Sequence, residues 1–194
     1  MEVNQAGDPL VLGLAVFVVG AVALGMQLLD FVTAGGSVVP IALAASGLGL
    51  LVSTFWAIRL EQTFVAGVVG IFAAFWLSYA VLLLGLSHNW FGIPPEDVLG
   101  TIRLFLIAWA VLGSLLLIAS LRLPAAFPLL IALVVATVIV LIIAYAGDTP
   151  SSGLRKVGGV VLLGSAAVGA YLFISSAFVS LGGKALPTGK PILK

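Results

Sequence analysis

The amino-acid sequence predicts an all-α membrane protein, built as a bundle of six transmembrane helices. The first observation is composition: 62% of the 194 residues are hydrophobic and only 8% are charged, whereas a soluble domain carries about 25% charged residues. The second is that the apolar residues gather in six runs, each near the roughly 20 residues that a helix needs to cross a bilayer. The strands of a membrane barrel would instead alternate polar and apolar residues.

The six expected helices follow one another through short connections rich in glycine, proline and charged residues. They cover residues 9–29, 38–58, 64–86, 98–121, 124–146 and 157–181. An even number of spans places both ends of the chain on one side of the membrane. We therefore expect a short N-terminus (residues 1–8), one transmembrane domain (9–181) and a tail (182–194) on the same side as the N-terminus.

Basic residues in the short loops predict the orientation. Five of them fall on the side of the termini and three on the other side: Arg59, Arg122, Lys184, Lys190 and Lys194 against Arg103, Arg155 and Lys156. Because cytoplasmic loops are enriched in Lys and Arg, both termini are expected in the cytoplasm. The first apolar run lacks a basic N-terminal flank, so we expect a permanent span and not a cleaved signal peptide.

Several classes of chemistry are excluded by what the sequence lacks. It contains no cysteine, and its one histidine, His88, falls in a loop. No ionisable residue lies near the middle of any span, where proton relays and ion-coupled pumps carry them. We therefore predict that the protein is not an enzyme and binds no metal and no cofactor. Its basic residues are scattered, so nucleic acid is not an expected partner.

The stretch that begins the first span predicts the mouth of a pathway. Asp8 suits a helix N-cap, because its carboxylate can accept hydrogen bonds from free backbone N–H groups. Pro9 suits the first helical position, where the missing N–H costs nothing. One turn later Gly13 lets another helix approach, and Phe17 places an aromatic ring at membrane depth. The pathway mouth is thus predicted at Asp8, Pro9 and Gly13.

Aromatic residues of the third span suggest a narrowing. Phe72, Phe75 and Tyr79 share one helix face by their spacing. Opposite Phe17, this face would form an apolar constriction that gates by excluding water, although aromatic residues at this spacing also serve simply as core.

Hydroxyl and small side chains leave two interpretations open. Ser78 and Thr137 offer hydroxyls to a solute or bond to their own helix carbonyls. Small residues spaced along the second and sixth spans favour close helix packing or a narrow pore wall. They are Ala45, Gly49 and Ser53, then Ser165 and Gly169, and Ala166 and Ala170.

The chain resembles the acetate uptake transporter family, which includes the bacterial succinate–acetate permeases. Residues 8–14, Asp-Pro-Leu-Val-Leu-Gly-Leu, are similar to the family's Asn-Pro-Ala-Pro-Leu-Gly-Leu at the first span. Two further landmarks follow in order. They are Thr63-Phe64 with Phe75-Trp76-Leu77-Ser78, and the tail motif Leu186-Pro187-Thr188-Gly189. With the length and the six spans, the resemblance covers nearly the whole chain.

The resemblance implies a homo-hexamer in the bacterial inner (plasma) membrane. Each protomer would carry its own pathway for small monocarboxylates such as acetate, with proton co-transport or passage of the protonated acid. The family's constriction is formed by a Phe, a Tyr and a Leu, and these places correspond to Phe17, Phe72 and Val134. Gly169 corresponds to a small pore-facing residue. The pathway lining is thus predicted at Phe75, Ser78, Thr137 and Gly169.

Several positions depart from the family pattern. Asp8 replaces the signature Asn, and a carboxylate there would repel an anion. Leu50 and Ala57 stand near places that are often polar in the family. These differences also allow a channel for a small neutral solute (urea, an amide or ammonia). A third reading is a non-transporting subunit of a larger membrane complex. Asp8 could also sense protons at the mouth, although helix capping explains the residue as well.

Overall fold

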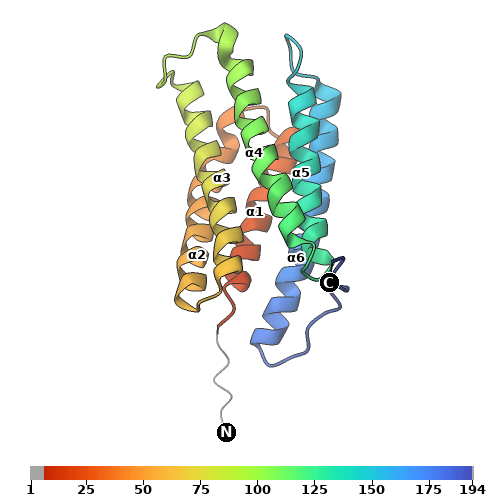
Figure 1. The fold of residues 1–194 in the computed structure, drawn as a ribbon. Coiled ribbons are helices and arrows are strands. Elements are labelled where there is room, and N and C mark those ends of the chain that lie inside the picture. Colours follow the sequence, from red (N-terminus) through yellow and green to blue (C-terminus); the bar gives the residue numbers. More distant parts are fainter. Residues whose placement is uncertain (1–6, 194) are drawn as a thin grey trace.

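Six long helices form an upright bundle in the computed structural model, which describes residues 7–193 (Figure 1). Each is long and apolar enough to cross a membrane. They are α1 (Leu10–Leu28), the second span made of η1 (Gly35–Val38), η2 (Ile41–Leu48) and α2 (Gly49–Arg59), α3 (Thr63–Ser87), η3 (Pro95–Asp97) with α4 (Val98–Ser120), α5 (Ala126–Ala144) and α6 (Ser152–Ser180). The predicted fold class, an all-α six-helix membrane bundle, is confirmed.

The start of α1 follows the predicted chemistry of Asp8 and Pro9. The Asp8 carboxylate accepts a hydrogen bond from the Leu10 N–H at 2.9 Å. Pro9 has helical backbone angles, φ −60° and ψ −23°. Asp8 therefore caps the helix with its side chain while Pro9 sets the first turn.

The second span departs from the uniform helix that the sequence suggests. Residues Ile41–Leu48 form a π-helix between Pro40 and the regular helix α2. A π-helix bonds each N–H to the carbonyl five residues back, and such segments are frequent at functional sites. From this stretch and from α2, Ser46 and Ser53 donate hydrogen bonds to α1, to the carbonyls of Val16 (2.8 Å) and Pro9 (2.7 Å). The small residues of this span thus serve packing against α1.

The sixth helix begins earlier than residue 157, where its apolar run starts. The Ser151 hydroxyl accepts a hydrogen bond from the Leu154 N–H at 3.4 Å, and the helix runs from Ser152 to Ser180. Hydropathy places the border too late because the first turn of this helix carries Arg155 and Lys156. A polar first turn projects beyond the apolar core and stays helical through its cap.

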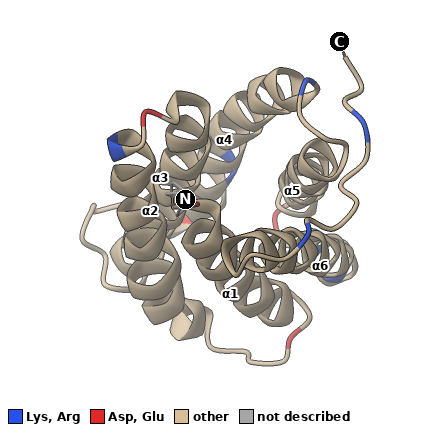
Figure 2. Cartoon of the chain, turned by 90° about the horizontal axis from the view of Figure 1, so that it is seen from below, with Lys and Arg blue, Asp and Glu red and all other residues tan. Residues whose placement is uncertain are grey.

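The helices pack as a ring around a loosely filled centre. α1 lies along α6, α6 along α5, α5 along α4, and α2 along α3, whereas α3 and α4 meet at few points. Where α1 meets α6, a Cβ added at Gly159 would stand 2.9 Å from the Gly25 carbonyl oxygen. Glycine is needed at this contact because the two backbones approach so closely. Seen from below, α1, α3, α4 and α5 surround the axis of the bundle (Figure 2).

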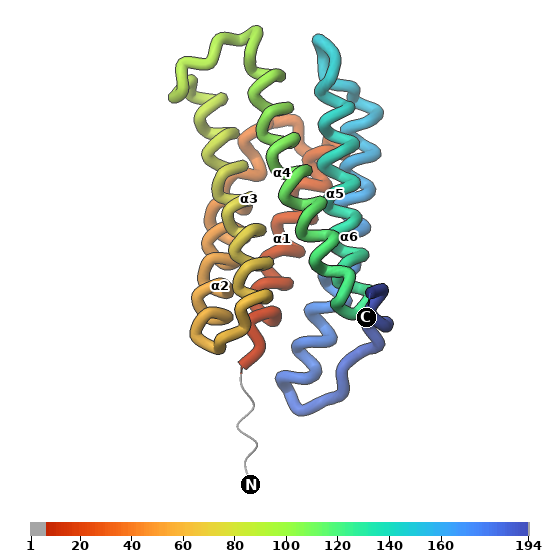
Figure 3. Tube along the Cα trace, in the orientation of Figure 1, coloured from red at the N-terminus to blue at the C-terminus, as the bar shows by residue number. Residues whose placement is uncertain are grey.

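The tail returns along the lower end of the bundle, where the described chain also begins (Figure 3). Tyr171 donates a hydrogen bond to the Pro187 carbonyl at 2.8 Å, and the Ala126 N–H donates to the Thr188 carbonyl at 3.0 Å. The second bond gives a partner to a free N–H at the start of α5. The tail is therefore fixed to α5 and α6. Most of the expected N-terminus, residues 1–6, and Lys194 lie outside the described residues.

Candidate functional site

Two cavities lie one above the other inside the bundle. The upper cavity holds about 70 Å³ and the lower about 50 Å³. A space of about 10 to 15 Å³ accommodates the centre of one water, so each cavity has room for a small solute. α1, α3 and α5 line both cavities. α4 and α6 contribute to the upper one, and Leu50 of α2 to the lower one.

The aromatic pair Phe17 and Phe72 separates the two cavities. Both rings line both spaces, and they meet edge to face with their centroids 5.3 Å apart. Edge-to-face contact is a preferred geometry for aromatic rings. The two rings therefore form a boundary between the two cavities.

A side cavity between α3, α4 and α5 lies next to the aromatic pair and is lined by Val134 and Phe75. This space holds about 30 Å³, and Phe72, Phe75 and Val134 line both it and the upper cavity. The predicted constriction residues Phe17, Phe72 and Val134 thus come together from three different helices, α1, α3 and α5. All three cavities are lined without a charged side chain.

The other predicted site residues take separate places. Thr137 lines the upper cavity and donates its hydroxyl to the Leu133 carbonyl at 2.9 Å. Gly13 lines the lower cavity. Asp8 and Pro9 stand one turn before Gly13, at the lower end of α1, and are absent from the lining of the three cavities. Ser78 is also absent from it, and its hydroxyl donates to the Phe75 carbonyl at 3.0 Å.

Gly169 lies behind Phe17 and does not line any of these three cavities. A Cβ added there would stand 3.2 Å from Cδ1 of Phe17 and 3.1 Å from Cγ2 of Val18. The small residue therefore makes room for the Phe17 ring against α6.

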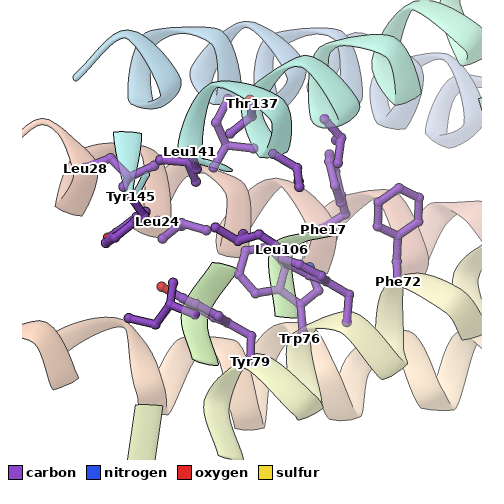
Figure 4. A pocket seen from close by; sticks show the side chains of 15 residues that line it. Phe17, Leu24, Leu28, Phe72, Trp76, Tyr79, Leu106, Thr137, Leu141 and Tyr145 are labelled. Atoms are coloured by element: carbon purple, nitrogen blue, oxygen red, sulfur yellow. The ribbon is translucent and has the colours of Figure 1, made fainter. Parts of the chain in front are cut away.

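A vestibule of about 150 Å³ adjoins the upper cavity at the end opposite the termini. Leu24, Leu28, Tyr79 and Tyr145 line both spaces. Figure 4 shows Tyr79 and Tyr145 toward one end of the cavity and Phe17 with Phe72 toward the other. The tyrosines give this end a polar border that the aromatic pair lacks.

Of the three cavities and the vestibule, the vestibule alone is lined by a charged residue. Arg155 lines it and donates to the Asp30 carboxylate at 3.1 Å, while the Lys156 ammonium stands 3.3 Å from the same carboxylate. Two cations against one carboxylate leave this cluster with one net positive charge. The pairs are partly exposed, so they contribute little to stability, but their net charge favours the approach of anions.

Among the residues that line the upper cavity, sequence reasoning did not assign the polar aromatic residues Trp76 and Tyr145 to the pathway. Trp76 stands within the aromatic stretch of the third span and lies directly beside Phe75. Tyr145 follows the last residue of α5. The signal available in the sequence was their residue type. A tryptophan or tyrosine buried in an apolar span usually finds a hydrogen-bond partner, and such a residue is therefore a candidate for the lining of a pathway.

The fold and these cavities define a multi-pass membrane protein of the channel or transporter class for small solutes. Residues 1–180 match the GPR1/FUN34/yaaH family, so the chain belongs to this family. The expected membership in the acetate uptake transporters is confirmed. The fold matches the solved structure of the bacterial acetate channel SatP with a TM-score of 0.83, over 95% of this chain and 100% of that one, at 17% sequence identity.

Relatives in yeast are similar in sequence over most of this chain. Accumulation of dyads protein 2 and Ammonia transport outward protein 2, both of Saccharomyces cerevisiae, are each 28% identical to it over 167 residues, 82% of this chain. The chain spans 57% of the length of each of these relatives. The first name refers to dyads and the second to outward transport of ammonia.

Proposed function

We propose that the protein is a channel or transporter for small monocarboxylates such as acetate. The observation that carries this proposal is the pair of apolar cavities in line, which the Phe17–Phe72 contact separates, with Val134 beside the upper one. The likeness to an acetate channel supports it. In this proposal Phe17, Phe72 and Val134 form the constriction, and Phe75 and Thr137 line the pathway above it. Asp8, Pro9 and Gly13 mark its lower mouth.

The species that crosses the constriction is the neutral, protonated acid. A carboxylate loses its hydration in an apolar space, and without a cation beside it this costs several kcal/mol. The cavities on both sides of the constriction are lined by no cation. The net positive charge near the vestibule attracts the anion, which then takes up a proton before it enters. Each acid molecule therefore carries one proton with it.

The membrane placement follows from the loops. Arg59, Arg122, Lys184 and Lys190 belong to the lower end, with the tail, and we assign this end to the cytoplasm by the positive-inside rule. The protein would then occupy the plasma membrane of a bacterium with both termini inside. The outward apolar faces of α2 and α4 would contact lipid and neighbouring copies in a homo-hexamer, each protomer keeping its own pathway.

Uptake of labelled acetate into proteoliposomes tests this function. Uptake should exceed that of empty vesicles at about pH 5, near the pKa of a carboxyl group. It should fall about tenfold for each further pH unit, as the neutral fraction does. A rate that follows total acetate and not the neutral fraction would contradict passage of the neutral acid. A rate equal to that of empty vesicles would contradict the acetate function.

A small neutral solute is the second candidate. The absence of a charged side chain from the linings of the three cavities suits ammonia or urea as well as acetic acid, and one relative is named for ammonia transport. Stopped-flow measurements on the same vesicles, with gradients of urea, ammonia and acetic acid, separate the candidates. Rapid urea or ammonia flux without acetate uptake would favour this alternative.

A further inference from the structure

One buried donor in the wall of the upper cavity lacks a partner. Among the described residues, two buried side-chain polar atoms have no hydrogen-bond partner, Nε1 of Trp76 and Oε1 of Gln27. Trp76 lines the upper cavity and Gln27 lines the vestibule next to it. Both unmatched atoms therefore belong to residues of the proposed pathway.

The Trp76 side chain is held in place by its neighbours. It is 2% exposed, and its ring meets Phe75 and Tyr79 edge to face, with centroid distances of 5.4 and 6.4 Å. A Cβ added at Gly20 would stand 2.8 Å from Cζ2 of the indole. The glycine of α1 thus leaves a notch that receives the ring. In Figure 4 the indole lies between Tyr79 and the Phe17–Phe72 pair.

A donor in this position gains a solute as its partner only when neighbouring side chains move, because the indole nitrogen has almost no accessible surface. A buried N–H without an acceptor carries the full cost of its lost hydration. Water is a poor substitute beside a single donor, because a buried water needs about two to four polar partners. The hydroxyl of Ser46, which also approaches Gly20, donates to the Val16 carbonyl and does not accept a hydrogen bond from the indole.

We propose that the Trp76 indole N–H is the solute-binding donor of the upper cavity, and that it selects solutes that can accept a hydrogen bond. The carbonyl oxygen of a neutral carboxylic acid meets this requirement, while the methyl group of acetic acid faces the apolar wall. This inference rests on the proposed function, because it names the group that holds the solute just above the constriction.

Fluorescence of Trp76 tests binding directly. A protein with Trp56, Trp90 and Trp109 changed to Phe keeps Trp76 as its one tryptophan. Titration with acetate at about pH 5 should change its emission in a saturable way. The same titration of a protein that also carries Phe72→Ala should keep this response. Loss of the response there would show that the aromatic pair, and not the indole, holds the acid. No response in a protein that takes up acetate would overturn the proposal.

Flux through a matched pair of variants tests the hydrogen bond. Trp76→Phe should raise the acetate concentration for half-maximal uptake about three- to tenfold, as expected for one lost hydrogen bond. Trp90→Phe makes the same chemical change in the loop after α3, where the side chain is 59% exposed, and should leave this concentration unaltered. Equal values for Trp76→Phe and wild type would overturn the proposal.

A shape-preserving replacement separates the N–H from the bulk of the ring. Benzothienylalanine at position 76 puts sulfur in place of N–H, and it should weaken uptake as Trp76→Phe does. Full activity of this analogue, with loss in Trp76→Phe, would assign the residue to packing alone. If the wild-type protein moves no acid, the proposed function fails. In that case the fluorescence titration still decides whether the upper cavity binds an acid molecule.

Discussion

Phe17 of α1 and Phe72 of α3 meet edge to face at 5.3 Å and are shared by the lower and upper cavities. The contact brings two helices that otherwise touch little into register at the centre of the bundle. Because Phe17 is 4% exposed, its ring has little freedom to turn aside. In the proposed pathway, passage would then depend on movement of Phe72, whose side chain also borders the side cavity.

The first prediction removes the Phe72 ring. Phe72→Ala should join the two cavities, raise acetate flux several-fold and admit larger acids, because an apolar constriction excludes solutes by size and by dewetting. Uptake of acetate, butyrate and benzoate into proteoliposomes measures both effects. Phe55→Ala is the control, since this phenylalanine of α2 is 59% exposed on the outer face. Wild-type flux and selectivity in folded Phe72→Ala would place the constriction elsewhere.

The second prediction narrows the pathway from behind Phe17. Gly169→Val adds atoms where even a Cβ would stand 3.2 Å from the Phe17 ring, so the ring should shift toward Phe72 and flux should fall several-fold. Gly164→Val is the matched control on the same helix, because its Cβ would meet only Leu133, at 3.9 Å. Equal flux in the two variants would show that the Phe17 position does not govern passage.

The arrangement of the spans was predictable from the sequence, and the cause is physical. Runs of apolar residues long enough to cross a bilayer leave no alternative to helices, since every backbone group must be satisfied within the span. The π-helix at Ile41–Leu48 was not predictable, because hydropathy does not report which carbonyl each N–H selects. The start of α6 was not predictable either. Its first turn is polar and is held by a hydrogen bond to the cap residue Ser151, and hydropathy does not report such a bond.

The site was predictable only in part. Residue spacing in the third span and the family resemblance both predicted that Phe17 and Phe72 face each other at a constriction. The two rings are in contact, and their role as a constriction stays a prediction. The rotation of each helix about its axis could not be read, because these helices are apolar on every side. Ser78 and Trp76 stand two residues apart on α3, and only the packed structure shows that Trp76, and not Ser78, lines the upper cavity.

The third prediction concerns the attachment of α1 to α2. Ser53→Ala removes the buried hydrogen bond to the Pro9 carbonyl, at 2.7 Å, and should lower the unfolding free energy by about 0.6 to 1.7 kcal/mol, the range for such bonds between membrane helices. Thr54→Val is the control, because its hydroxyl bonds within its own helix, to Leu50 at 2.8 Å. Unfolding in detergent micelles with denaturant measures both. Equal losses would show that the bond between helices adds nothing.

The last prediction tests the two roles of Asp8. Its carboxylate accepts the Leu10 N–H at 2.9 Å, which is the bond expected of a cap. An asparagine oxygen accepts the same bond, so Asp8→Asn should keep both the stability and the pH profile of uptake. Asp8→Ala should lose about 1 kcal/mol of stability, as caps do, again without a change in the pH profile. Thermal unfolding and acetate uptake between about pH 5 and 8 measure these outcomes. A displaced pH profile in Asp8→Asn, with unchanged stability, would instead show that the carboxylate at the lower mouth takes part in proton transfer to the solute.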